Sequence, residues 1–213
     1  KYKIFTGLQN NDGEGMARAF TEEERIKIKE KIMEAALDLF HDKGTKALSI
    51  AELTKRAGIA QGTFYNFWKD KEALIIEVIT YRSIQKLHNI EKEFPHSLKD
   101  PAAFLTDIVY RYSVDLVIKI KTQPVYKDAF KIFEAKGPQE AHKMEVLYQD
   151  FFERLIQYWL KNGAIKRVDK KGLMNAFIGS SILCVQYYQF DEAYFNEVLR
   201  TYIAGIVNKY IEV

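Results

Sequence analysis

The chain has 213 residues, of which 47% are hydrophobic and 29% charged, a balance typical of a folded globular protein rather than a disordered one. Its formal net charge of +3 is too small to indicate nucleic-acid binding by itself. The only cysteine, Cys184, excludes an internal disulfide and suits a reducing cytoplasm, and no apolar run reaches the ~18 residues of a membrane span.

Residues 1–15 show no helical periodicity, and we expect residues 1–20 to be a tail or an added leader, with Met16 as the candidate native start. From Thr21 onward the pattern is helical. Thr21 and Glu24 are spaced as a capping box, and apolar residues then recur at intervals of three and four. The pattern predicts a first helix that ends at Gly44.

Two short helices and a longer one are predicted next. Ser49 and Glu52 form a second capping box, at the start of a helix that ends near Gly58. A short helix follows over roughly residues 61–67, and Asp70 caps a fourth helix that continues to about residue 93.

The helices after Pro95 are longer. The sequence predicts them at residues 101–121, 122–135, 139–161, 169–189 and 191–210. No segment alternates with period two for long enough to indicate a strand. We therefore predict an all-α fold of about nine helices, with three helices in an N-terminal domain at residues 21–69 and a larger helical domain at residues 70–213.

The second and third helices predict a helix-turn-helix motif over residues 49–68. Gly58 lies at the tight turn, where glycine tolerates a positive φ. Leu53 of the first helix can pack against Ile59 and Phe64 across that turn. This arrangement projects the start of the second helix outward, as DNA-binding motifs of this kind do.

The polar residues of this motif suit a DNA duplex. Amide and hydroxyl side chains can hydrogen-bond base edges, tyrosine and lysine can bind phosphates, and glycine lets the backbone approach closely. Residues 43–71 also carry six basic residues against two acidic ones, a local charge of +4. A helical hairpin inside a larger bundle is the alternative, but the turn, the polar set and the charge coincide. The predicted DNA contacts are Gln61, Gly62, Thr63, Tyr65, Asn66 and Lys71.

The stretch from Ala57 to Leu74 resembles the signature of TetR/AcrR-family transcriptional regulators, through its turn, its Gly-Thr-Phe-Tyr step and its Lys-Asp-Lys-Glu helix start. The match covers about residues 25–75. The resemblance implies a regulator, usually a repressor, that binds a palindromic double-stranded DNA operator as a dimer. It also implies that Ser49 contacts phosphate or a base, that Gln61, Gly62 and Thr63 read bases, and that Tyr65 and Lys71 clamp the backbone.

Three positions depart from the family pattern. Ala60 replaces the usual serine-like cap, a loss of ~1 kcal/mol for the recognition helix. Gln61 replaces a frequent lysine, and Asn66 stands where histidine or a bulky aromatic residue is common. These departures bear on which operator is bound, not on whether DNA is bound.

Residues 100–190 are rich in aromatic side chains. Rings at helical spacing usually fill a core, and that interpretation remains open for each of them. The family resemblance implies instead that some line a pocket for a small, often apolar effector, with tyrosine hydroxyls as polar groups. The candidate ligand-binding residues are Phe104, Ile108, Tyr112, Tyr148, Phe152 and Leu155.

The last two helices carry apolar faces that are too wide for one intramolecular contact. They predict a homodimer through a four-helix bundle, with two recognition helices ~34 Å apart on a palindromic operator. An effector would act by tilting the fourth helix. The predicted interface comprises Leu173, Phe177, Ser180, Ser181, Cys184 and Tyr188, together with Phe195, Val198, Leu199, Tyr202, Ile206 and Tyr210. Gly179 and Gly205 would permit close helix crossing.

The sequence does not indicate an enzyme, a metal site or a cofactor. Gly13 and Gly15 precede no strand–helix unit that could hold a phosphate. The four histidines lack metal-ligand spacing, and Cys184 lies in an apolar stripe. The remaining alternative is a helix-turn-helix protein whose larger domain has a filled core, binds a protein partner and senses no small molecule.

Overall fold

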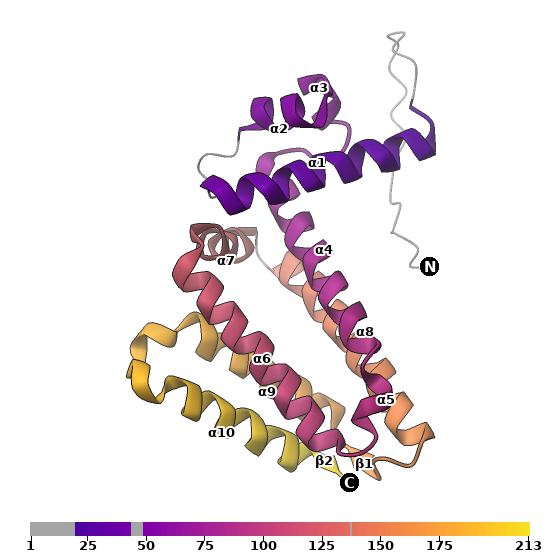
Figure 1. The fold of residues 1–213 in the computed structure, drawn as a ribbon, viewed down its shortest axis with the longest axis vertical. Coiled ribbons are helices and arrows are strands. Elements are labelled where there is room, and N and C mark those ends of the chain that lie inside the picture. Colours follow the sequence, from indigo (N-terminus) through magenta and orange to yellow (C-terminus); the bar gives the residue numbers. More distant parts are fainter. Residues whose placement is uncertain (1–19, 44–48, 137) are drawn as a thin grey trace.

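The computed structural model describes residues 20–43, 49–136 and 138–213 (Figure 1). Within these residues the chain forms ten α-helices, one 3₁₀ helix and a two-stranded sheet, which confirms the all-α prediction. One helix more than the predicted nine is present, the single turn α5 (Phe94–Ser97), because proline is accepted in the first turn of a helix. The leader, Met16 and Gly44 lie outside the described residues.

The N-terminal helices begin at the predicted caps. In α1 (Glu22–Lys43), the Thr21 amide donates to Glu24 Oε2 at 2.9 Å and the Glu24 amide donates back to Thr21 Oγ1 at 3.2 Å. Ser49 Oγ accepts the Glu52 amide at the start of α2 (Ile50–Ala57). These side chains satisfy amides that a helix leaves unpaired at its start.

The next two helices differ in how they begin. The recognition helix α3 (Gln61–Phe64) is shorter than predicted, and residues 65–67 continue it only as turns. The Asp70 side chain accepts the Ala73 amide at the start of α4 (Lys71–Glu91).

Five longer helices build the rest of the molecule: α6 (Pro101–Thr122), α7 (Pro124–Lys136), α8 (Pro138–Lys161), α9 (Lys170–Val185) and α10 (Glu192–Tyr210). The predicted helix at residues 169–189 is interrupted, and its end forms the 3₁₀ helix η2 (Tyr187–Gln189). The sequence predicted no strand, but β1 (Arg167–Val168) pairs antiparallel with β2 (Ile211–Glu212). Two-residue strands are too short to show a period-two pattern.

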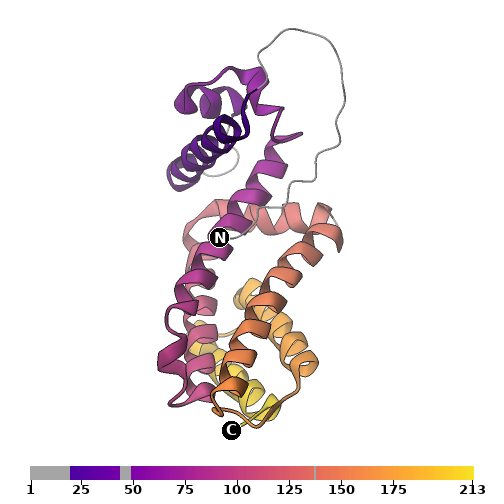
Figure 2. The same ribbon diagram turned by 90° about the vertical axis from the view of Figure 1, so that its right-hand side faces the viewer.

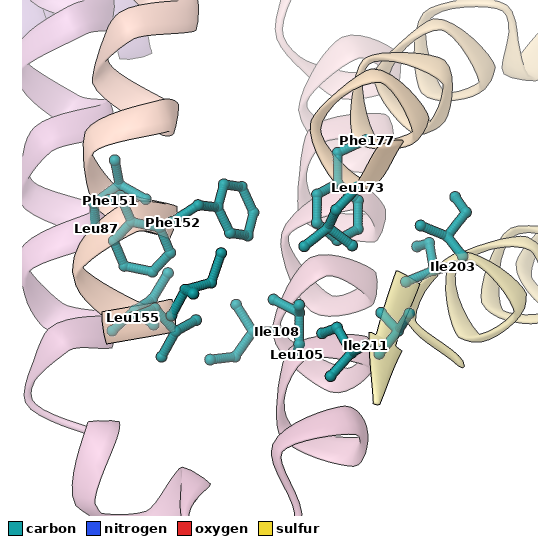
Figure 3. Packing of buried hydrophobic residues seen from close by; sticks show 14 of the residues in the cluster. Leu87, Leu105, Ile108, Phe151, Phe152, Leu155, Leu173, Phe177, Ile203 and Ile211 are labelled. Atoms are coloured by element: carbon teal, nitrogen blue, oxygen red, sulfur yellow. The ribbon is translucent and has the colours of Figure 1, made fainter. Parts of the chain in front are cut away.

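Two clusters of buried side chains form the core. The larger one joins α4, α6, α8, α9 and α10, and Figure 3 shows part of it, with Trp159 fully buried elsewhere in the same cluster. The smaller one joins α1–α4 around Leu53, Phe64 and Trp68, and it also includes Val125 and Ala129 of α7. Helix α7 therefore packs against the N-terminal helices.

Helix α4 runs from the N-terminal helices into the larger domain, as Figures 1 and 2 show. It supplies Leu74 and Val78 to the smaller cluster and Leu87 and Ile90 to the larger one. Helix α10 packs mainly on α6 and α9. Among the described helices, none combines the length and the apolar character that crossing a membrane requires.

Candidate nucleic-acid interface and effector region

The turn between α2 and α3 has the predicted geometry. Gly58 adopts a left-handed conformation with φ 68°, and its amide donates to the Lys55 carbonyl. The Ile59 amide donates to the Thr54 carbonyl at 2.9 Å. Leu53 and Phe64 are both fully buried in the smaller cluster, and Ile59 packs against it, as the predicted packing across the turn requires.

Helix α3 is held by packing rather than by its own ends. As expected from Ala60, no side chain caps it, and four residues are too few for an independent helix. Beneath it, the Phe64 and Trp68 ring centroids lie 5.5 Å apart. The Trp68 Nε1–H donates to Glu77 Oε2 at 2.5 Å, and Lys29 pairs with the other oxygen of Glu77 at 2.5 Å. One carboxylate of α4 thus joins α1 to the residues that follow α3.

The predicted DNA contacts lie at or near the surface of this unit. Gln61, Gly62, Tyr65 and Asn66 of the recognition segment are exposed, as is Ser49 at the start of α2, while Thr63 and Lys71 are half-buried. A Cβ atom built on Gly62 would meet no atom within 4 Å. In Figure 1, α2 and α3 lie at the end of the molecule farthest from the C-terminus, on the opposite side of α1 from the larger domain.

Sequence reasoning missed the support that α1 gives to this segment. Arg25 Nη2 donates to the Asn66 carbonyl at 3.4 Å, and the Arg25 guanidinium lies 5.2 Å from the centroid of the Phe67 ring. These contacts join residues 41 positions apart, and no local spacing indicates them. Arg25 fixes the backbone where Asn66 leaves the recognition helix.

The six candidate effector-binding residues fall into two groups. Ile108, Phe152 and Leu155 are buried, and the Phe152 ring stacks on Phe177 at 5.0 Å between centroids (Figure 3). Phe104 and Tyr112 are half-buried and pack against the edge of the same cluster, and 38% of Tyr148 is exposed. The assignment of these residues to a ligand pocket remains a prediction.

Two surface hollows in the described part of the chain lie away from these residues. One is formed by β1, β2 and the end of α10, and the other, about 560 Å³ in volume, by α6, η2 and the start of α10. Neither is lined by any of the six candidates. Hydrophobic periodicity placed those side chains on inward faces, but it cannot distinguish a filled core from a pocket.

A charged cluster not singled out in the sequence lies between α4 and α6. Lys86 Nζ and Lys119 Nζ both contact Asp115 Oδ2, at 2.9 Å and 2.6 Å. Burial acts to raise the pKa of Asp115, but the hydrogen bonds from Lys119 and Lys86 outweigh it and hold that pKa below its usual value. The i, i+4 spacing of Asp115 and Lys119 was visible in the sequence, whereas the partner on α4 was not.

The terminal helices correct the predicted interface. Its predicted members Leu173, Phe177, Ser180, Cys184, Phe195, Leu199 and Ile206 are buried in the chain's own core. Two predicted members, Val198 and Tyr202, are exposed on α10, and the other exposed apolar side chains of α9 and α10 are Ile178, Ile182 and Tyr194, which were not predicted. The prediction erred because α9 is apolar around most of its circumference, so its pattern did not say which side meets the rest of the chain.

Metal-binding and nucleophilic groups are sparse. Among the described residues, no three His, Cys, Asp or Glu side chains lie together as a metal site would require. Burial raises the pKa of the Cys184 thiol, which also has a hydrogen bond with Ser113. A thiol in this setting stays protonated near neutral pH and is a poor nucleophile.

Comparison with known proteins places the motif in a family. Residues 32–78 match the family model described as "Bacterial regulatory proteins, tetR family". The chain is 26% identical over 190 residues to the uncharacterized HTH-type transcriptional regulator YhgD of Bacillus subtilis, covering 87% of this chain and 95% of that protein. It is 32% identical over 97 residues to the regulator AcrR of Shigella flexneri, covering 44% of this chain and 43% of AcrR.

Solved structures share the fold at low identity. RolR in complex with resorcinol aligns with a TM-score of 0.60 and 18% identity, over 89% of this chain and 90% of that one. A TetR transcriptional regulator from Rhodococcus sp. RHA1 aligns with a TM-score of 0.57 and 16% identity, over 88% and 98% of the two chains. The family model and the related regulators, with the helix-turn-helix at residues 49–68, show that the chain belongs to the TetR/AcrR family of transcriptional regulators, which is not a family of enzymes.

Proposed function

We propose that this regulator is a repressor that binds a palindromic DNA operator as a homodimer and releases it when a small, largely apolar effector binds the larger domain. The observation that carries the proposal is the contrast in burial between neighbouring side chains of α3 and the residues beside it. Phe64 and Trp68 are committed to the core, while Gln61, Gly62 and Asn66 face solvent beside them. A rigidly mounted row of polar groups is what reading a major groove requires.

The contacts divide into base-reading and backbone-binding groups. Gln61, Thr63 and Asn66 carry the amide and hydroxyl groups that pair with base edges, and the open space at Gly62 lets the backbone approach the duplex. Tyr65 and Lys71 bind phosphates and fix the register. Ser49 caps α2 with its oxygen lone pair, which leaves its hydroxyl hydrogen to donate to a phosphate.

The dimer forms through the outer faces of α9 and α10. Ile182 is 57% exposed, and Val198 and Tyr202 on α10 add apolar surface. A Cβ atom on Gly179 would collide with the Tyr202 hydroxyl, so the glycine allows that side chain to lie against α9. Burying this face against its symmetry copy removes apolar area from water and sets two α3 helices ~34 Å apart. The protein works in the cytoplasm, where its operator lies.

Helix α4 couples the two functions. It belongs to both buried clusters, and Glu77 on it holds Trp68 and Lys29. An effector that tilts α4 changes the separation of the two recognition helices. Typical coupling energies of ~1–3 kcal/mol correspond to roughly 5- to 150-fold weaker operator binding. RolR, whose complex contains resorcinol, illustrates that this fold accommodates a small ligand.

The second candidate is a regulator whose larger domain binds a protein partner and senses no small molecule. The burial of Ile108, Phe152 and Leu155 in a packed cluster favours it. The two functions differ in one measurement. A small-molecule effector stabilises the isolated chain against thermal unfolding, whereas a protein that senses none is stabilised only by its partner.

Operator binding is tested by selecting duplexes from a random pool and measuring fluorescence anisotropy on the selected palindrome. The variant Gln61→Ala should lose about 1–3 kcal/mol of operator-binding free energy, through loss of base discrimination at one position of the operator. Gln149→Ala, which removes an exposed glutamine of α8, is the matched control and should bind as the unaltered protein does. Selection of no palindrome, or equal losses in the two variants, contradicts the assignment.

A further inference from the structure

The charged cluster between α4 and α6 carries one more positive than negative charge. Lys86 and Lys119, from different helices, converge on one oxygen of Asp115. In the described part of the chain, no second carboxylate pairs with either ammonium group. Each ammonium has three N–H donors, so most of the donors in the cluster are not used by Asp115.

The surroundings compensate this excess charge only in part. The Lys119 side chain is only 22% exposed, and those of Lys86 and Asp115 are 38% and 39% exposed. Lys86 Nζ lies 5.3 Å from the centroid of the Tyr112 ring, and Lys119 Nζ lies 5.6 Å from that of Tyr126, and these cation–π contacts stabilise the ammonium groups in part. Burial acts to lower the pKa of Lys119, but its hydrogen bond with Asp115 and the nearby charges together outweigh burial and raise that pKa. Burial lowers the pKa of Lys86 despite its bond to Asp115, so Lys86 is the lysine whose charged form is incompletely compensated. A bound anion would supply the missing negative charge.

The cluster continues an apolar stripe. Phe104, Ile108, Tyr112, Asp115 and Lys119 are spaced by four, four, three and four residues, so they share one face of α6. The apolar members occupy the first half of the helix and the charged members the second half. Ile108 is buried in the core, whereas Phe104 and Tyr112 are half-buried. A molecule lying along this face would therefore meet Phe104 and Tyr112 at one end and two ammonium groups at the other.

Helix α8 adds a polar group beside α4. Burial raises the pKa of the Tyr148 hydroxyl, which has a hydrogen bond with Ser83, one turn before Lys86. Four residues after Tyr148, Phe152 reaches the same apolar cluster as Ile108 (Figure 3). Helix α8, which packs against α4, therefore also carries a polar group near the two lysines and an apolar group near the core, as α6 does.

We propose that Lys86 and Lys119 bind the carboxylate of an amphipathic monoanion whose apolar body lies along Tyr112 and Phe104, the half-buried side chains of the same face. The inference deepens the proposed effector function and rests on it. One negative charge matches the single excess positive charge of the cluster. Asp115 holds the two lysines together when the site is empty and competes with the ligand for them.

The test uses the full chain without DNA and two pairs of probes, octanoate with octanamide and 2-naphthoate with 2-naphthamide. Each amide has the shape of its acid without the charge. By isothermal titration calorimetry, at least one carboxylate should bind at one site per chain, roughly tenfold tighter than its amide. Absence of binding by both carboxylates, or equal affinity for an acid and its amide, overturns the proposal.

Three variants and one control variant locate the charge effect. Lys119→Met and Lys86→Met should each abolish the preference for carboxylate, whereas Lys161→Met, at the far end of α8, should keep it. Asp115→Asn should strengthen carboxylate binding roughly tenfold, because it removes the competing anion. A merely structural ion pair predicts no such gain. Circular dichroism confirms folding, and a preference that survives both lysine variants overturns the proposal.

Failure of this inference is distinguishable from failure of the proposed function. Operator binding of Lys119→Met, measured by anisotropy without any probe, should match that of the unaltered protein because Lys119 lies outside the DNA-binding helices. A regulator that binds its operator but prefers no carboxylate overturns only the inference. A chain that binds no operator overturns the proposed function itself.

Discussion

Replacing Phe64 with alanine tests whether the smaller cluster is what holds the recognition helix. Phe64 is fully buried and contacts Tyr65 and Trp68. Removing a fully buried phenylalanine ring costs about 3–5 kcal/mol. For a unit of this size, 1 kcal/mol shifts the midpoint of thermal unfolding by about 4–8 °C. The N-terminal helices should therefore unfold at least roughly 12 °C lower in Phe64→Ala.

The two tryptophans allow each cluster to be followed separately. Trp68 lies in the smaller cluster and Trp159 in the larger one. Fluorescence melting of Phe64→Ala in a Trp159→Phe background should report the early transition. In a Trp68→Phe background, the fluorescence of Trp159 should report a nearly unchanged transition. Each double variant is compared with the single tryptophan variant that retains Phe64. Equal shifts of both signals would mean that the molecule unfolds as a single unit, and no shift of either would refute the role given to Phe64.

Three other predictions follow from the same structure. The pKa of Asp115 is lower in the folded than in the unfolded chain, so its ion pairs stabilise the fold at neutral pH. This stabilisation is lost as the pH falls below about 4. In acid denaturation experiments, Asp115→Asn should therefore lack this part of the loss of stability. Gly172→Ala places a Cβ atom against the Tyr210 ring and should lower the melting temperature. Ile182→Glu should convert the dimer to monomers in sedimentation experiments. Ile26→Glu, the same substitution at an exposed isoleucine on α1, is the control and should leave the dimer intact.

Local signals predicted much of the DNA-binding unit. The caps at Thr21, Ser49 and Asp70 and the turn glycine Gly58 all act as the sequence indicated, because capping and left-handed turns depend on residues a few positions apart. The burial of Phe64 was likewise implied by its spacing from the turn.

The contacts that assemble these elements could not be predicted in the same way. Arg25 reaches Asn66, and Lys86 reaches Asp115, from helices far apart in sequence. The apolar pattern of α9 gave the right helix but assigned Leu173 and Cys184 to a partner rather than to the chain's own core. Periodicity shows that a face is buried, whereas only the packing of α10 on α6 and α9 shows what buries it.

The measurement that tests the central claim most directly is operator binding by Gly62→Ala. Apart from its chain neighbours and the backbone of its own helix, no atom of the protein lies within 4 Å of the added methyl group, so we expect any loss of affinity to come from contact with the DNA. On the selected palindrome, anisotropy should show binding that weakens steeply with added salt and is much weaker in Gly62→Ala, although that variant melts no earlier than the unaltered protein. Unchanged affinity in Gly62→Ala would contradict the account, because α3 would then not approach the duplex.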